Sequence, residues 1–241
     1  MFKGHANKDR FVDIRLSSET LDIYHIRVSI YRSLQSHLGK FHGTLLDIGC
    51  GQMPYREMIL SRGQVNKYIG LDLENSQIHN TAKADLLWDG ISMPIADNSV
   101  DCAFATEVLE HCYQPGILLS ETLRVLKPNG VFFFTVPFLW PIHEVPFDEY
   151  RYTPYSLEKL LQRAGFHEIV ITAPGGWHSS MAQMLGLWVR RSPLSTIKRK
   201  WLSILLMPVI KYLLKNHKDQ VIDFQESQML TSLHGISYKP K

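Results

Sequence analysis

The sequence predicts an α/β fold built on a mostly parallel sheet, and two patterns carry this prediction. Short apolar runs alternate with segments of helical periodicity from residue 44 to residue 136, as expected for strands joined by crossover helices. Glycines and acids stand where these runs end, first at Asp47-Ile48-Gly49-Cys50-Gly51. Because ligands of open α/β sheets bind at the carboxyl ends of the strands, this turn is the first place to expect one.

Length and composition fit one large domain, or one domain with an insertion. The chain has 241 residues, of which 45% are hydrophobic and 20% charged, as in ordinary globular proteins. A net charge of +3 is too small to indicate a nucleic-acid partner. The N-terminal residues lack a signal-peptide pattern, and Cys50, Cys102 and Cys112 lack metal-ligand spacing. We therefore expect a cytoplasmic protein with reduced cysteines and no metal.

The first 40 residues are expected to form an N-terminal arm and a helix. Residues 1–17 are mixed and polar, which is typical of a loosely held arm. Residues 18–38 carry apolar side chains at roughly helical spacing, so this segment should form a helix that packs beside the first strand.

The elements of the main domain follow in order, each from a local signal. Strands are predicted at 44–48, 67–72, 83–88, 100–105, 131–136 and 167–172. Helices are predicted between them at 55–62, 116–126 and 155–164. Pro54 suits the opening turn of the first helix, Lys127-Pro128-Asn129-Gly130 should stop the second, and Gly165 should close the third.

The turn after the first strand favours one class of ligand over another. Gly49 and Gly51 lack a Cβ and let the backbone approach a ligand closely. A dinucleotide would require a third glycine, but 52–54 read Gln-Met-Pro, and Asp47 would repel a pyrophosphate. An acid at this position suits a ligand that carries an ammonium group. Asp72 follows Gly51 by 21 residues, the spacing of an acid that binds an adenosine ribose, although an acid there can also merely cap a loop.

Together these motifs resemble the class I S-adenosylmethionine-dependent methyltransferases of the Methyltransferase-11 type. The segments that carry the resemblance are 45–51, 68–72, 93–101, 107–111 and 123–130. The resemblance implies a Rossmann-like sheet of seven strands in the order 3-2-1-4-5-7-6, flanked by helices, with an antiparallel last strand at 234–239. It makes 41–173 and 233–241 the S-adenosylmethionine-binding domain and leaves 174–232 as a helical insertion or lid.

The resemblance also implies S-adenosylmethionine as cofactor and assigns residues to it by position. Gly49 and Gly51 would border the methionine part, with Asp47 beneath the loop, near the ammonium or holding the turn. Asp72 would bind the ribose hydroxyls. The remaining implied cofactor residues are Leu73, then Asp85 and Leu86 at the adenine, and Glu107 at the end of the fourth strand.

The segment 137–153 should choose the acceptor, because it follows the fifth strand and is rich in aromatic residues and proline. It is similar to a loop in methyltransferases encoded with surface-glycan biosynthesis genes. A hydroxyl acceptor must lose its proton, and His143 is the candidate base, with Asp148 to orient it and His111 as a second candidate. Arg151 suits a carboxylate or phosphate of the acceptor; alternatively, Asp148 and Arg151 pair and hold the loop closed. The other predicted substrate-binding residues are Tyr55, Trp140 and Tyr152.

The insertion is unusual, because aromatic and apolar residues alternate with basic ones over 185–215. Its apolar run at 201–210 contains Pro208 and is too short to span a bilayer. A basic amphipathic segment can lie on an anionic membrane surface, cover the substrate cleft or form the face of a homodimer. All three remain open.

The predicted function is methyl transfer to a small-molecule, glycan or lipid-linked acceptor, at oxygen. The rivals are a quinone or other lipid methyltransferase, and a non-catalytic partner of a glycan-biosynthesis complex. Asp47 and the absent third glycine argue against an NAD-dependent dehydrogenase. A nucleic-acid methyltransferase would place an Asn-Pro-Pro-Tyr-type sequence where Thr106-Glu107-Val108-Leu109 stands.

Overall fold

A computed structural model describes residues 10–74, 84–215 and 224–241 of the chain. Three parts of the predicted elements lie outside these ranges. They are the beginning of the N-terminal arm, the first residue of the strand predicted at 83–88, and residues 216–223 of the insertion.

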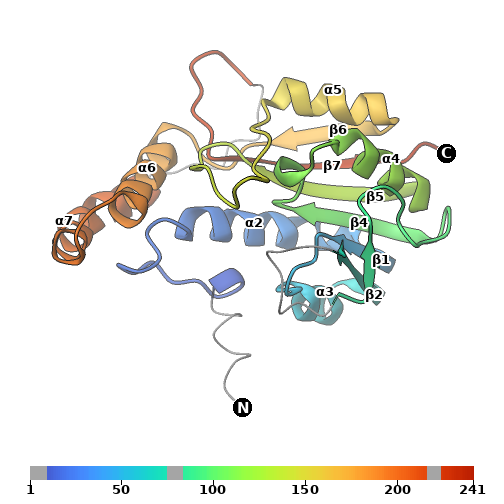
Figure 1. Cartoon of the computed structure of the whole chain (residues 1–241), viewed down its shortest axis with the longest axis horizontal. Helices are drawn as coiled ribbons and strands as arrows, with labels where there is room; N and C mark the ends of the chain where they lie inside the picture. The colour runs from blue at the N-terminus through green and yellow to red at the C-terminus, as the bar shows by residue number, and fades with distance from the viewer. Residues whose placement is uncertain (1–9, 75–83, 216–223) are drawn as a thin grey trace. The chain divides into compact units, whose positions relative to one another are not determined.

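A seven-stranded sheet with the order β3-β2-β1-β4-β5-β7-β6 organises the fold (Figure 1). Its strands are β1 (His42–Ile48), β2 (Gln64–Leu73), β3 (Leu86–Trp88), β4 (Val100–Thr106), β5 (Leu126–Pro137), β6 (His167–Thr172) and β7 (Ser232–Tyr238). Neighbours from β3 to β5 all pair in parallel. The predicted order and the mostly parallel sheet are confirmed.

The last strand runs antiparallel to β5. The backbone N–H of Asn129 donates to Lys239, and that of Lys239 donates to Gly130, so the end of β7 meets the start of β5. At the other end, Phe138 donates to Thr231, directly before β7. The start of β7 therefore lies beside the end of β5, as in an antiparallel pair.

The core lies under the central strands, where the sequence is most continuously apolar. Phe132, Phe133 and Phe134 in β5 are all fully buried. The ring of Phe41 packs on Phe104 and Phe133, with centroids 6.4 and 6.0 Å apart. Because each buried phenylalanine contributes about 1.5–3 kcal/mol, these rings fix the strands on whose ends the functional residues stand.

One helix precedes the first strand, and others connect the strands close to the predicted positions. They are α2 (Tyr24–His37), α3 (Arg56–Arg62), α4 (Pro115–Val125) and α5 (Pro154–Ala164), with short 3-10 turns at Leu38–Lys40 and Leu109–His111. Helix α5 begins in a capping box between Thr153 and Ser156 and ends at Gly165, whose φ of 99° is left-handed. Glycine favours this closing position because it has no Cβ to clash.

Two element boundaries differ from the sequence prediction. The helix expected from residue 18 begins at Tyr24, because the Thr20 hydroxyl donates to Arg15 at 2.6 Å and accepts from Ser17 N at 2.9 Å, which stabilises a turn. Residues Lys127–Gly130 do not stop a helix, since α4 already ends at Val125. They form a bulge in β5, with Asn129 at a φ of 62°.

The chain divides into two compact units. One consists of Met1–Ser33, Phe138–Pro141 and Thr172–Leu233, and the other of Leu34–Pro137, Ile142–Ile171 and His234–Lys241. The second unit contains most of the sheet. The first contains helices α6 (Trp177–Arg191) and α7 (Thr196–Lys215). The division of the chain into the domains expected from the sequence stays a prediction.

Helices α6 and α7 pack on the segment before α2. Leu21, Ala182, Val189 and Ile210 form the buried centre of this unit. The segment before α2 is tied to α6 at Asp22, whose carboxylate accepts from Arg191 at 2.6 Å. Among the residues that the structure describes, no helix combines the length and the hydropathy needed to cross a bilayer.

Candidate functional site

The glycine turn after β1 is fastened to the end of β2. Gly49 and Gly51 both have positive φ, 64° and 49°, and a Cβ on Gly49 would lie 2.7 Å from the side chain of Val108. Asp72 accepts from Gly51 N at 3.1 Å through one carboxylate oxygen and from Leu73 N at 2.9 Å through the other. The structure thus brings Gly49, Gly51, Asp72 and Leu73 together at the carboxyl ends of two neighbouring strands.

Asp47 lies beneath this turn and is only 3% exposed. Its carboxylate accepts from the Tyr68 hydroxyl at 2.5 Å, and the guanidinium of Arg56 stands over the Tyr68 ring. Burial raises the pKa of Asp47 to about 8, although the hydrogen bond from Tyr68 opposes the rise. This placement fits a residue that holds the turn, and its approach to an ammonium group stays a prediction.

The predicted adenine residues, Asp85 and Leu86, lie at the start of β3, beside β2. One oxygen of Asp85 accepts from Gly70 N at 2.8 Å and lies 3.4 Å from Arg56 Nη1. The predicted bond to an adenine amino group would therefore use the other oxygen. Leu86 begins β3 opposite Leu71, and the side chain of Leu73 is exposed at the end of β2.

Glu107 follows β4 directly and has an uncommon backbone conformation. Its φ is 57°, which non-glycine residues rarely adopt and which neighbouring contacts must stabilise. Two hydrogen bonds to Thr135 of β5 do so. The Glu107 N–H donates to the Thr135 carbonyl at 3.0 Å, and the Thr135 hydroxyl donates to the Glu107 carboxylate at 2.9 Å.

A second group of charged side chains gathers on the segment after β5. Arg151 donates to both oxygens of Asp148, at 2.6 and 2.8 Å. The same carboxylate, 4% exposed, accepts from the backbone N–H of His143 and from its ring Nδ1, both at 3.1 Å. Burial works against the charge of Asp148, but Arg151 and His143 lower its pKa to about 2. Asp148 therefore makes both contacts considered from the sequence: it binds the ring of His143, and it pairs with Arg151.

His111 and His143 face each other from two different segments. Their rings lie 4.8 Å apart and are inclined by 67°. The Nδ1 atom of His111 donates to the Phe147 carbonyl at 3.0 Å, while its Nε2 atom lies 3.6 Å from Glu110 and 3.3 Å from Glu144. Burial lowers the pKa of His143 below its ordinary value, since desolvation outweighs the attraction of Asp148.

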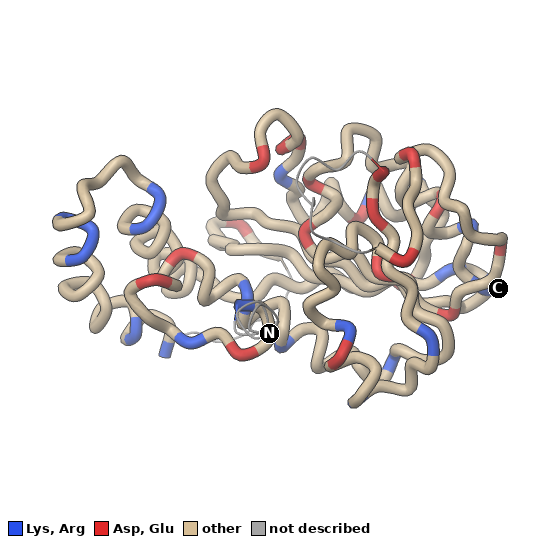
Figure 2. The backbone as a smooth tube through the Cα atoms, turned by 60° about the horizontal axis from the view of Figure 1, so that its bottom comes forward, with Lys and Arg blue, Asp and Glu red and all other residues tan. Residues whose placement is uncertain are grey.

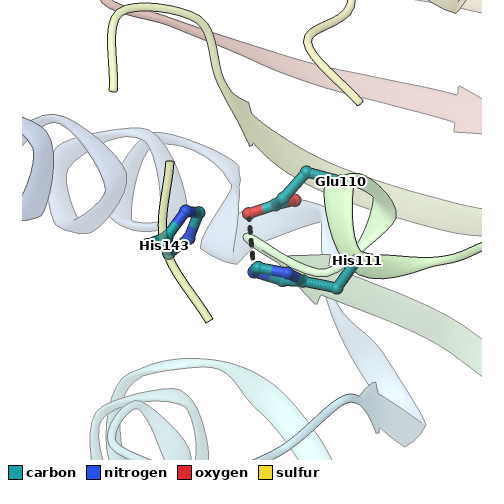
Figure 3. A group of neighbouring side chains, drawn as sticks. All are labelled: Glu110, His111 and His143. Atoms are coloured by element: carbon teal, nitrogen blue, oxygen red, sulfur yellow. Dashed lines mark ion pairs between the residues drawn. The ribbon is translucent and has the colours of Figure 1, made fainter. Parts of the chain in front are cut away.

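Sequence reasoning missed Glu110, which belongs to the same cluster (Figure 3). Its side chain is fully buried, and neither carboxylate oxygen has a hydrogen-bond partner among the described residues. Burial and the nearby charge of Glu107 raise its pKa well above the ordinary value. The sequence holds one signal for it, since Glu110 directly precedes the candidate base His111 in Glu-Val-Leu-Glu-His.

The three aromatic residues predicted to bind substrate are placed differently from one another. Tyr152 is buried, and its hydroxyl donates to the Leu109 carbonyl at 3.0 Å. Tyr55 is also buried, directly before α3. Trp140 belongs to the other compact unit, where Arg191 lies 5.7 Å from its ring. The structure gives the two tyrosines packing positions, and contact of all three with an acceptor stays a prediction.

Comparison with known proteins identifies the domain that carries the glycine turn. Residues 46–134 match the family model of a methyltransferase domain. Methyltransferase AacuQ of Aspergillus aculeatus is 38% identical over 107 residues, covering 41% of this chain and 33% of that protein. A probable S-adenosylmethionine-dependent methyltransferase of Mycolicibacterium smegmatis is 28% identical over 138 residues, 51% of each chain. The chain thus spans one third to one half of the length of these relatives.

Solved structures show the same fold over a larger share of the chain. A SAM-dependent methyltransferase of Thermotoga maritima, described as a possible histamine N-methyltransferase, matches with a TM-score of 0.58 and 15% identity over 91% of this chain and 92% of its own. The strand order, the glycine turn and the family match agree with one another. The chain therefore has the fold of the class I, S-adenosylmethionine-dependent methyltransferases, and its residues 46–134 match a methyltransferase domain.

Proposed function

We propose that the protein transfers a methyl group from S-adenosylmethionine to a hydroxyl oxygen of a small-molecule acceptor, of the glycan or lipid-linked type. In this reaction the oxygen forms a bond to the methyl carbon, the sulfonium bond breaks, and a thioether leaves. The acceptor's proton must also leave. The protein accordingly has to bind the cofactor, align the acceptor hydroxyl with the methyl group and accept the proton that the hydroxyl loses.

The turn after β1 and the end of β2 support binding of the cofactor. Each carboxylate oxygen of Asp72 accepts one backbone N–H and retains a second acceptor position. These positions suit the two ribose hydroxyls. Gly49 and Gly51 leave space for the methionine part, because neither presents a side chain there.

The observation that carries the proposal of an oxygen acceptor is the pairing of His143 with Asp148. The Nδ1–H of His143 donates to Asp148, which fixes the ring 4.8 Å from that of His111 and leaves the lone pair on Nε2. The cluster adjoins the glycine turn through Val108, which contacts Gly49 and stands two residues before Glu110. This proximity supports His143 as the residue that takes the proton from the acceptor hydroxyl.

The contacts of Arg151 favour a positioning role for this residue. Both of its terminal nitrogens already donate to Asp148, so an acidic acceptor would have to compete with a bidentate ion pair. Arg151 then acts through Asp148 by keeping His143 in place.

The proposal is tested by His143→Ala, assayed with nucleotide-linked and lipid-linked sugars as acceptors. We expect kcat to fall by about 10²-fold or more, as for loss of proton transfer, with an unchanged KM for S-adenosylmethionine. His178→Ala serves as the control, because His178 is exposed on α6 in the other compact unit. Full turnover of His143→Ala at saturating acceptor would sink the proposal.

One observation favours a lipid-linked acceptor, and with it a cytoplasmic protein in peripheral contact with a membrane. Helix α7 presents large apolar side chains to solvent, namely Ile197, Trp201, Ile204, Leu205, Val209 and Tyr212. Lysine and arginine residues accompany them along α6 and α7 (Figure 2). Such a surface suits anionic lipid headgroups. A quinone or other lipid acceptor fits this surface equally. A non-catalytic partner protein would bind the cofactor or nothing, and it would methylate no acceptor.

A further inference from the structure

We propose that Glu110, His111 and His143 bind one divalent transition-metal ion of the zinc class. Each residue offers one ligand atom, and these atoms all lie within 4.8 Å of one another. Figure 3 shows the Glu110 carboxylate and the two imidazole rings directed toward a common space. Glu110 and His111 end the short 3-10 turn after β4, and His143 comes from the segment after β5.

Both histidines are held in the orientation that metal ligands require. The Nδ1–H of His143 donates to Asp148 at 3.1 Å, and that of His111 donates to the Phe147 carbonyl at 3.0 Å. A neutral imidazole that donates from Nδ1 carries its lone pair on Nε2. Metal-bound histidines in proteins are oriented in the same way, by a carboxylate or a backbone carbonyl on the other ring nitrogen.

The third ligand is a buried carboxylate that the described residues leave without a hydrogen bond. Glu110 is fully buried, and both its oxygens lack a hydrogen-bond donor within the described ranges. Burying such a group without a partner is costly. The Nε2 atom of His111 lies 3.6 Å from Glu110 Oε1, too far for a hydrogen bond. A cation between these atoms would give the buried carboxylate the partner it lacks among the described residues.

The surrounding charges also favour a cation. Glu144 places an oxygen 3.3 Å from His111 Nε2, and Glu107 acts on Glu110 electrostatically, with Asp148 as a further negative neighbour and Arg151 as the opposing positive charge. Two carboxylates thus face one imidazole nitrogen. A cation at this nitrogen would be attracted by both carboxylates.

Two imidazoles and one carboxylate form a donor set typical of zinc and of other divalent transition metals. Three protein ligands leave a coordination position open. An acceptor hydroxyl bound there would have a lowered pKa and would release its proton to solvent, as metal-bound water does. This last step rests on the proposed function, while metal binding itself does not. In this arrangement His143 serves as a ligand, and the bound metal replaces it in assisting the loss of the hydroxyl proton.

Calorimetry on the full-length protein, stripped by a chelator and titrated with Zn²⁺, tests the proposal. We expect one ion per chain and an affinity at least about 10-fold lower in Glu110→Gln and in His143→Gln. His167→Gln is the matched control, because the half-buried His167 forms a similar pair with the exposed Glu168 in the same unit. Absence of binding, or equal binding by wild type and both ligand variants, would overturn the proposal.

Thermal unfolding gives a second readout that needs no activity. Zn²⁺ should raise the Tm of the wild type by mass action and leave that of Glu110→Gln unchanged. Without metal, Glu110→Gln should be at least as stable as the wild type, because it replaces a buried carboxylate by a neutral amide. Binding of S-adenosylmethionine is measured on the same samples. Zinc binding without cofactor binding would contradict only the proposed function, and the reverse only the metal site.

Discussion

The carboxyl group of Asp47 is buried, and burial makes its charged form unfavourable. Its pKa of about 8 in the folded protein compares with 3.8 in a solvated chain, and the main cause is burial. Between these values the folded protein retains a proton that the unfolded chain releases. The free energy of unfolding therefore falls as the pH rises from about 4 to about 8, and it levels off above that.

Asp47→Asn should remove this dependence. The amide keeps an oxygen for the Tyr68 hydroxyl and carries no charge, so we expect the variant to exceed the wild type in stability by several kcal/mol at pH 9, on the order of 1.4 kcal/mol for each pH unit that separates the folded and unfolded pKa values. At pH 5 the difference should be only about a third as large, and it should grow steadily up to about pH 8. Urea unfolding from pH 5 to pH 9 measures both curves, and parallel curves for the two proteins would refute the assignment.

Individual residues differ in how far the sequence reveals them. Gly49, Gly51 and Asp72 follow from spacing along the chain, and the structure places them together. Glu110 was missed because its burial depends on what the turn after β4 packs against, which no local pattern records. The double role of Asp148 was likewise not decidable from the sequence, since its contacts with His143 and Arg151 exist only in the folded segment.

At the scale of elements, α5 depends on the cap that joins it to the segment with His143 and Asp148. The Thr153 hydroxyl accepts from Ser156 N at 3.2 Å, and the Ser156 hydroxyl accepts from Thr153 N at 3.0 Å. Thr153→Ala should lower the free energy of unfolding by about 1 kcal/mol, measured by urea denaturation. Thr153→Ser keeps the accepting oxygen and should stay close to the wild type. Equal losses in both variants would exclude the cap as the cause.

Elements with local start and stop signals are those that the sequence predicts well. Helix α5 has a proline at its first position and a glycine after its end, so its limits could be read directly. The bulge at Lys127–Gly130 could not, because it exists through pairing with β4 on one side and β7 on the other. Helix α7 is apolar on most of its faces, so periodicity alone could not reveal which side is buried.

For the whole molecule, we expect binding to vesicles that contain anionic lipid and weak binding to zwitterionic ones. Replacing Trp201, Ile204 and Leu205 together by serine should reduce cosedimentation with anionic vesicles by about 10-fold or more, because buried apolar area supplies most of the affinity. Ile91→Ser is the control, since Ile91 is equally exposed in the other unit. Failure of the wild type to bind anionic vesicles would contradict the proposed membrane contact. If the protein were then found to be a dimer in solution, the exposed apolar residues of α7 would be assigned to the dimer interface.

The overall topology could be predicted because it follows from the order of strands and helices, together with the resemblance of five short segments to one enzyme class. The two compact units could not be predicted, since the first combines segments from three separate parts of the chain. Such an association depends on long-range packing, as between Leu21 and the residues of α6 and α7.

The central claim is that the turn after β1 and Asp72 bind S-adenosylmethionine. Calorimetric titration with S-adenosylmethionine and S-adenosylhomocysteine tests it most directly, in the wild type, in Asp72→Ala and in the control Asp89→Ala, whose carboxylate caps an exposed turn. We expect micromolar binding by the wild type and the control, and binding at least about 10-fold weaker in Asp72→Ala, since loss of hydrogen bonds to a charged group costs about 1.5–3 kcal/mol. A folded wild type that binds neither compound would contradict the account.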